Sequence, residues 1–252
     1  KVGKQNTGTN IRFTPDPKYF DTTKLALAKL QHVLRAKAVL CPGLEVTLID
    51  EKGKTKTQWH YSDGLKSYLE QALPDFKLVP KAPFEGDMSG NDESVTWALH
   101  WTEDDGELVT ESYVNLVPTA QGGTHVSGLR QGLLESLREF CEFKNLLPRG
   151  LKLTADDVID RCAYILSVKL TDPQFSGQTK ERLSSRSCSA FVSGVVRDAF
   201  SIWLNQHAET GEKIAEIAIQ RAQRRVRAAK TVIRKKAGGL GPALPGKLAD
   251  CS

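Results

Sequence analysis

Two polar side chains, Gln178 and Lys180, occur in a short stretch, residues 172–186, whose composition suits the binding of an anion. The stretch opens with Asp-Pro and continues through Ser-Gly, which are typical of a turn. Its second half is predicted to start a helix, with Thr179 as the cap and Glu181 in the first turn. An ammonium, an amide and free N–H groups at a helix start suit a phosphate. The alternative is an ordinary surface lysine in a polar loop.

Positive charge is concentrated near the end of the sequence. Residues 217–252 carry nine Lys or Arg and one Asp, a formal +8, which leaves −3 for the rest of a chain of net charge +5. Self-repulsion of this kind is relieved by a phosphate backbone, so the segment predicts sequence-independent binding to DNA. A solvated helix face is the alternative. The residues predicted to face DNA here are Arg221, Arg224, Arg225, Arg227 and Lys230.

Several kinds of chemistry are excluded or disfavoured. The sequence contains no GxxxxGK[ST], HExxH or GxSxG motif and no carboxylate cluster, so no metal site is predicted. The five cysteines form no CxxC pair, which favours reduced thiols in a cytoplasmic protein. No apolar run is long enough for a membrane span, so no membrane partner is expected. His125 is predicted to be a hydrogen-bonded structural residue, and Asp156 and Asp157 are predicted to start a helix.

The apolar patterns predict an α+β fold for this chain of 252 residues. The apolar face of helix 127–145 is predicted to contain Leu129, Leu133, Leu137 and Phe140, and that of helix 188–206 Phe191, Val195, Ala199 and Ile202. The predicted elements are a strand over 9–14, a helix over 25–39, a hairpin over 44–61, a helix over 65–73, a loop over 74–92, a second hairpin with strands 94–102 and 107–116, helix 127–145, a short helix near 155–161, strand 163–170, helix 188–206 and a long basic helix over 212–236.

Four segments resemble, in the same order, the B subunits of bacterial type II topoisomerases. They are YVNL (113–116), QGGTHVSGLR (121–130), PQFSGQTKERL (173–183) and LPGKLADC (244–251). The third resembles the QTK loop of this family, and the likeness covers nearly the whole chain. AVLCPG (38–43) and LPRGLKL (147–153) are more similar to the topoisomerase IV branch than to the gyrase branch.

The resemblance implies three parts. Residues 1–63 would be the C-terminal part of a GHKL-type ATP-binding domain, residues 64–236 a transducer domain ending in the long basic helix, and residues 237–252 a linker and the start of a TOPRIM domain. The implied transducer fold is similar to a ribosomal-protein domain with a left-handed βαβ crossover, whereas the sequence pattern alone favours the right-handed default. The sequence is therefore expected to be an internal part of a longer chain.

Site residues follow from the resemblance as well. Lys180 would be the catalytic residue that reaches the γ-phosphate of ATP, with Gln178 supporting it. Thr9 and Ile11 would line the adenine pocket, and Arg130 would face a cavity through which DNA travels. A simple exposed strand and a helix-surface arginine are the respective alternatives. The family's catalytic Glu, its Mg²⁺-binding Asn and its glycine-rich lid would precede Lys1, so this chain alone is expected not to hydrolyse ATP.

The implied function is ATP-dependent: this region would couple ATP binding and hydrolysis to DNA strand passage, decatenation and relaxation. The implied partners are the topoisomerase IV A subunit in an A2B2 heterotetramer, a second B subunit on ATP binding, and double-stranded DNA. The gyrase B subunit, whose enzyme supercoils DNA, is one alternative. A non-enzymatic nucleic-acid-binding module built on the basic helix is another.

Overall fold

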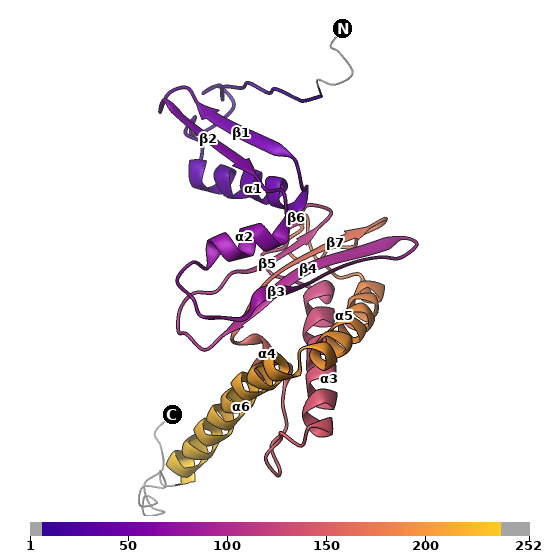
Figure 1. Cartoon of the computed structure of the whole chain (residues 1–252). Coiled ribbons are helices and arrows are strands. Elements are labelled where there is room, and N and C mark those ends of the chain that lie inside the picture. The colour runs from indigo at the N-terminus through magenta and orange to yellow at the C-terminus, as the bar shows by residue number, and fades with distance from the viewer. Residues whose placement is uncertain (1–6, 238–252) are drawn as a thin grey trace, which may run out of the picture.

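The computed structural model describes residues 7–237, and the side chains of residues 7–229 (Figure 1). The predicted start of the TOPRIM domain and the side chain of Lys230 lie outside these limits.

A five-stranded mixed sheet organises the molecule, in the order β3-β4-β7-β5-β6. Strands β3–β4, β4–β7 and β5–β6 are antiparallel, and β5 and β7 are parallel. The central strand β7 has apolar residues on both faces, since Leu166 belongs to one apolar cluster and Ile165 to the other. The strands are β3 (Leu78–Ser89), β4 (Glu93–Thr102), β5 (Thr110–Val114), β6 (Val117–Pro118) and β7 (Cys162–Leu170).

Two predictions about this sheet were wrong. The predicted loop 74–92 contains the long strand β3, which tolerates Pro80 and Pro83 because it is an edge strand and its pairing is irregular between Val79 and Phe84. The predicted second hairpin does not form, because β7 is inserted between β4 and β5. Instead β4 forms its hairpin with β3, and β5 pairs with β7 in parallel.

One face of the sheet is covered by α1 (Leu27–Leu40) and α2 (Leu65–Ala72). The small hairpin of β1 (Glu45–Asp50) and β2 (Thr55–His60) lies beyond α1 (Figure 1). These elements confirm the predicted helix, hairpin and short helix. The predicted strand over 9–14 is absent: this segment is exposed and has no neighbouring strand, because β1 and β2 pair only with each other.

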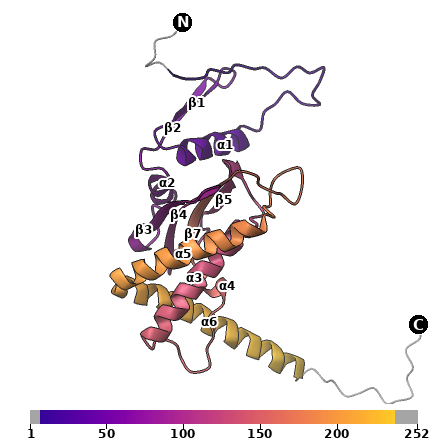
Figure 2. The same ribbon diagram turned by 90° about the vertical axis from the view of Figure 1, so that its right-hand side faces the viewer.

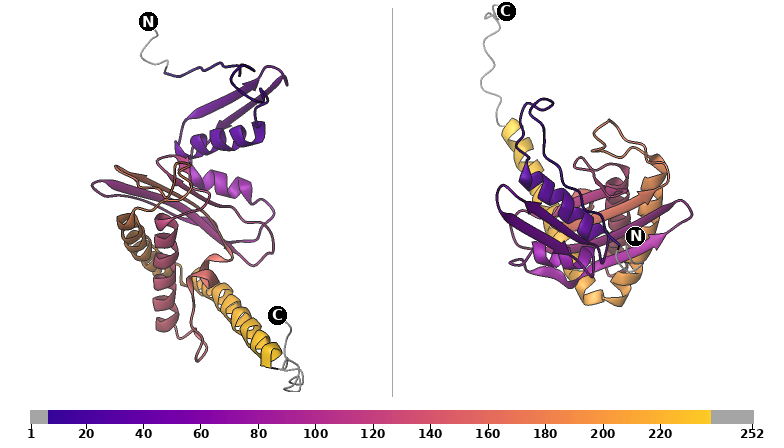
Figure 3. Two further views of the ribbon diagram at one scale, coloured as in Figure 1. Left: turned by 180° about the vertical axis from the view of Figure 1, so that it is seen from behind. Right: turned by 90° about the horizontal axis from the view of Figure 1, so that it is seen from above.

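The other face is covered by α3 (Thr124–Phe143) and α5 (Arg186–Gln206), which lie side by side (Figures 1 and 3). Two glycines of α3 allow the helices to approach this closely, because a side chain at either position would clash with α5. A Cβ at Gly128 would lie 2.5 Å from the Ser189 carbonyl oxygen, and a Cβ at Gly132 would lie 2.7 Å from the Ser193 carbonyl oxygen. Ser136, one turn further, donates its hydroxyl to the Arg197 carbonyl at 2.8 Å. This contact makes α3 and α5 a tightly packed pair.

The buried faces of these helices match the predictions only in part. Leu129, Leu133, Leu137 and Phe140 of α3 are buried, as predicted. On α5 the predicted face is confirmed in part: Phe191, Val195 and Ala199 are partly buried and pack against the core, whereas Ile202 is 60% exposed. The residues of α5 that enter the core are Cys188, Val192, Val196, Phe200 and Leu204.

The short helix α4 (Ala155–Ile159) and the long helix α6 (Ala208–Ala237) complete the fold. Thr154 and Asp157 form a reciprocal capping box at the start of α4. The first half of α6 packs on the core through Ile214, Ala218 and Ala222, and the rest projects away from the body (Figures 1 and 3).

Candidate functional site

The loop that carries Lys180 stands out between the end of β7 and the start of α5 (Figure 2). Gln178, Thr179 and Lys180 are all exposed at its tip. The Lys180 amide donates to the Gly177 carbonyl at 3.2 Å, which closes a tight turn, and Lys180 has a positive φ of 57°. Its ammonium lies 5.9 Å from the centre of the Phe175 ring. Among residues 7–237 no acidic side chain forms an ion pair with Lys180.

The predicted helix start at Thr179 is wrong. Residues 181–185 are not helical, and α5 begins only at Arg186. The segment does not form a helix because its backbone pairs with two neighbouring segments. Leu183 forms a β-bridge with Phe175 on one side and with Gly123 on the other. An anion at the tip would therefore meet the Lys180 ammonium and the Gln178 amide, without the dipole of a helix N-terminus.

Thr9 and Ile11 are exposed, and Ile11 keeps 78% of its surface accessible. The segment that contains them lies at the end of the molecule beyond the β1–β2 hairpin (Figure 1), where Arg12 pairs with Glu51 at 2.8 Å. No hydrogen bond joins this segment to the Lys180 loop in the described part of the chain. The structure thus leaves the two halves of the predicted nucleotide site apart.

A buried polar group lies beneath the loop at the start of α3. His125 is fully buried, and its Nε2 is 3.0 Å from the Thr119 hydroxyl, which donates to the Ser112 carbonyl at 2.9 Å. Burial lowers the pKa of His125 to about 4. A neutral imidazole in this position braces β5 against α3, which agrees with the predicted structural role.

Three arginines that were predicted to face DNA are held by carboxylates of α4 and the residue that follows it. Arg130 of α3 pairs with Asp156, Arg221 of α6 with Asp160, and Arg225 of α6 with Asp157. The last pair is bidentate, with Arg225 Nε and Nη2 donating to the two Asp157 oxygens at 2.9 and 2.8 Å. These side chains connect α4 to both α3 and α6.

Asp157 is the most buried member of this group, with 3% of its side chain exposed. Burial alone would raise its pKa, but hydrogen bonds from Arg225 and from the Thr154 amide and hydroxyl outweigh burial and lower it. The carboxylate is therefore ionised, and it is a structural anchor for α6.

Two further arginines of α6 remain exposed, Arg224 and Arg227. The Arg161 guanidinium lowers the pKa of the Asp105 carboxyl through a hydrogen bond and its charge. The charge of Arg224 adds a smaller lowering of the same pKa. The positive face of α6 is therefore partly balanced by acidic residues of the same chain.

The sequence analysis missed a cluster that joins residues 27–61 to the sheet. The Glu111 carboxylate accepts hydrogen bonds from the Tyr68 and Tyr113 hydroxyls at 2.9 and 2.6 Å. The Arg35 guanidinium lies 4.5 Å from the centre of the Tyr68 ring and donates to the Tyr61 hydroxyl at 3.1 Å. Burial and the nearby Glu111 carboxylate raise the pKa of both Tyr68 and Tyr113. These residues are spread over the sequence, so no local pattern could reveal the cluster.

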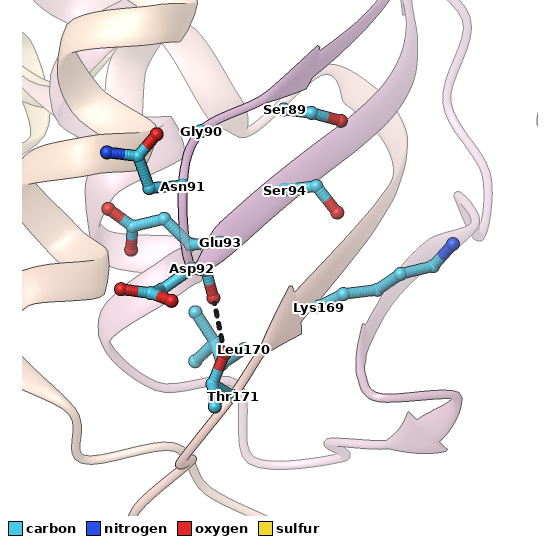
Figure 4. A pocket seen from close by; sticks show the side chains of 9 residues that line it. All are labelled: Ser89, Gly90, Asn91, Asp92, Glu93, Ser94, Lys169, Leu170 and Thr171. Atoms are coloured by element: carbon cyan, nitrogen blue, oxygen red, sulfur yellow. Dashed lines mark hydrogen bonds between the residues drawn. The ribbon is translucent and has the colours of Figure 1, made fainter.

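A shallow cavity of about 350 Å³ lies at the β3–β4 turn beside the end of β7 (Figure 4). Thr171 donates its hydroxyl to the Asp92 carbonyl across it, and burial together with Asp92 raises the pKa of Glu93. The cavity is lined by none of the predicted site residues.

Residues 7–237 include no group of three or more His, Cys, Asp or Glu that could hold a metal ion. No helix within the same limits is long and apolar enough to cross a membrane.

Comparison with known proteins gives a consistent result. The chain is 61% identical over 250 residues to the DNA topoisomerase 4 B subunit of Salmonella typhimurium and 62% identical over 249 residues to that of Haemophilus influenzae. Each alignment covers 99% of this chain, but the chain spans only about 40% of the length of these relatives. Among solved structures, the topoisomerase IV ATP-binding domain of Francisella tularensis superposes with a TM-score of 0.74 and 41% identity, over 89% of this chain and 61% of that one.

The family model described as DNA gyrase B matches residues 64–232, which include the five-stranded sheet, α3, α5 and most of α6. This match covers more than half of the sequence. The chain therefore belongs to the DNA gyrase B family.

Proposed function

We propose that the chain is part of the B subunit of a topoisomerase IV, a cytoplasmic ATP-dependent type II topoisomerase, and that residues 64–236 are its transducer domain. This domain would couple ATP binding and hydrolysis to the passage, decatenation and relaxation of DNA. Residues 1–63 would complete an ATP-binding domain, and residues 237–252 would lead into a TOPRIM domain. The names and the high identity of the relatives support this proposal.

The observation that carries the proposal is the exposed ammonium of Lys180, which has no acidic partner among residues 7–237, on a loop whose base is fixed by the backbone. ATP differs from ADP by the charge of its γ-phosphate, and one positioned ammonium responds to that difference. Lys180 would bind the γ-phosphate in the ground state and, more strongly, in the transition state. Gln178, two residues away on the same tip, would donate its amide to the same phosphate.

The rest of the nucleotide site would be assembled around this loop. Thr9 and Ile11 are proposed to meet the adenine, the hydroxyl by hydrogen bonding and the aliphatic side chain by packing. The ligands of Mg²⁺ are proposed to lie in the complete protein outside residues 1–252. Hydrolysis is therefore proposed only for the complete protein.

DNA would be contacted without base specificity. The proposed phosphate contacts are Arg130, Arg221, Arg224, Arg225, Arg227 and Lys230. At Arg130, Arg221 and Arg225 a phosphate would have to displace the paired carboxylate. A second B subunit on ATP binding and the topoisomerase IV A subunit, in an A2B2 complex, are the proposed protein partners.

The rigid part of the coupling would be the unit β5–α3–α4–β7, whose strands are parallel neighbours. We propose a left-handed crossover for this unit. Close packing of α3 on α5 supports a rigid element, because a tightly packed pair transmits a displacement without deforming.

The test uses the complete B subunit reconstituted with the A subunit. Lys180→Ala should depress ATP hydrolysis and ATP-dependent decatenation together, with normal thermal melting. Lys169→Ala, which removes an exposed lysine of β7, is the matched control. Normal activity of the Lys180→Ala enzyme would refute the sensing role. Supercoiling instead of decatenation by the wild-type complex would identify a gyrase.

A further inference from the structure

The base of the Lys180 loop is a small ladder of backbone hydrogen bonds. The Ser176 amide donates to the Arg182 carbonyl at 3.0 Å, and the Ser184 amide to the Gln174 carbonyl at 2.8 Å. These bonds pair the two arms of the loop in antiparallel fashion. The tip is therefore mounted on a fixed stem.

The second arm of the stem is also bonded to the segment that enters α3. The Leu183 amide donates to the Gly122 carbonyl, and the Thr124 amide donates to the Leu183 carbonyl, both at 3.1 Å. A Cβ on Gly123 would lie 2.3 Å from the Leu183 carbonyl oxygen, so the approach requires glycine at this position. Since Leu183 is 1% exposed, the stem is seated in the core and tied to the first turn of α3.

One side-chain contact reinforces this connection directly beside Lys180. The Gln121 amide group donates to the Glu181 carboxylate, with 2.9 Å between Nε2 and Oε2. The backbone of the same two residues is joined as well, with the Gln121 amide donating to the Glu181 carbonyl at 3.0 Å. In the described part of the chain the Glu181 carboxylate has no ion-pair partner, so its neutral amide partner anchors it without any involvement of Lys180.

We propose that Gln121 and Glu181 are positioning residues: their side-chain pair holds the Lys180 tip in register with the start of α3, so that the position of Lys180 on a phosphate is transmitted to α3. The inference rests on the proposed function and adds to it the route by which the loop is coupled. Neither residue touches the nucleotide in this account. Their effect is on where the ammonium lies when ATP is bound.

The experiment exchanges the two partners in the complete B subunit reconstituted with the A subunit. Gln121→Glu places two carboxylates against each other and should raise the KM for ATP about 5-fold, as expected for the loss of one hydrogen bond. Adding Glu181→Gln restores an amide–carboxylate pair in the opposite sense. This double variant should recover the KM for ATP to within about 2-fold of wild type, since the hydrogen bond is re-formed. Decatenation per ATP hydrolysed should follow the same order.

A role in folding alone would lower the melting temperature without changing the ratio of affinities for a non-hydrolysable ATP analogue and for ADP. That ratio is therefore measured for each variant, and Glu181→Ala provides a truncation that adds no repulsion. An unchanged ratio in Gln121→Glu and Glu181→Ala, or a defect that the double exchange does not rescue, would overturn the inference. Lys180→Ala, measured alongside, separates the two proposals. A normal Lys180→Ala enzyme overturns both, whereas a defective Lys180→Ala enzyme with normal exchange variants overturns the positioning role alone.

Discussion

Two regions of this molecule carry positive side chains that were predicted to bind phosphate groups, the loop after β7 and helix α6. The two regions differ in whether those side chains are paired with carboxylates of the same chain. On the loop after β7, the backbone is fixed by hydrogen bonds while the Lys180 ammonium is exposed and has no acidic partner in the described residues. On α6, Arg221 and Arg225 are held by the carboxylates of Asp160 and Asp157. Charge density along a sequence therefore does not reveal which cations are available to a ligand. The availability depends on what the fold places opposite each one.

The largest expected difference between the two regions is in catalysis. In the complete protein, Lys180→Ala should lower the rate of ATP hydrolysis by about 30- to 1000-fold, equivalent to roughly 2–4 kcal/mol, because a charge-assisted contact to the γ-phosphate is lost. Arg225→Ala, measured in the same assay, should leave the rate within about 2-fold, since its partner is a structural carboxylate. Equal losses of the ATP hydrolysis rate in Lys180→Ala and Arg225→Ala would show that the two cations do not differ in their role toward ATP.

The next effect is on stability and concerns α6. Asp157→Ala should lower the free energy of unfolding by about 2–3 kcal/mol, because it leaves the Thr154 cap and the Arg225 guanidinium without their acceptor. The melting temperature should fall by roughly 4–12 °C for a domain of this size. Asp156→Ala is the matched control, because 80% of the Asp156 side chain is exposed and its pair with Arg130 should contribute less than about 1 kcal/mol. A similar loss in both variants would mean that burial does not distinguish the pairs.

His125, which is buried at the start of α3, should make the free energy of unfolding depend on pH. Its folded pKa, about 4, lies below the unfolded value near 6.5, so the stabilisation is complete above pH 6.5 and is lost as the pH falls toward 4. At pH 5 the loss should be about 2 kcal/mol relative to pH 7. His125→Gln retains a donor for Thr119 but does not titrate, so its free energy of unfolding should change less over this range. Chemical denaturation at both pH values measures this, and identical pH profiles would contradict it.

The smallest expected effect concerns DNA. Arg224→Gln should reduce the slope of log affinity for duplex DNA against log salt by about one unit, because one phosphate contact is lost. Arg225→Gln should leave the slope unchanged, since its charge is already balanced by Asp157. A reduced slope in the Arg225 variant would show that DNA phosphates compete with α4 for this arginine.

Local patterns predicted much of the fold, and the failures have physical causes. The β1–β2 hairpin and the Leu129–Leu133–Leu137 face of α3 depend on residues close in sequence, and both are confirmed. Strand β3 was missed because proline counts against a strand, although an edge strand tolerates it. The insertion of β7 between β4 and β5 depends on residues 54 to 77 positions apart, so no turn motif reveals it.

The candidate site was also predicted only in part. The motif predicted a turn at residues 172–186, and in the structure Gln178 and Lys180 lie exposed at the tip of a loop there. The predicted helix start at Thr179 was wrong, because residues 181–183 pair with two neighbouring segments. The pairing of Arg225 with Asp157 joins residues 68 positions apart and could not be read from charge spacing. The roles of these residues toward ATP and DNA stay predictions.

The central claim, that Lys180 distinguishes a γ-phosphate from its absence, is tested most directly by equilibrium binding. The affinities of the complete wild-type protein for a non-hydrolysable ATP analogue and for ADP are compared with those of Lys180→Ala, with Lys169→Ala as the control. We predict that Lys180→Ala loses most of its preference for the ATP analogue while its affinity for ADP stays within about 2-fold of wild type, because ADP lacks the group that the ammonium binds. An unchanged preference, or an equal loss of affinity for both nucleotides, would contradict the account.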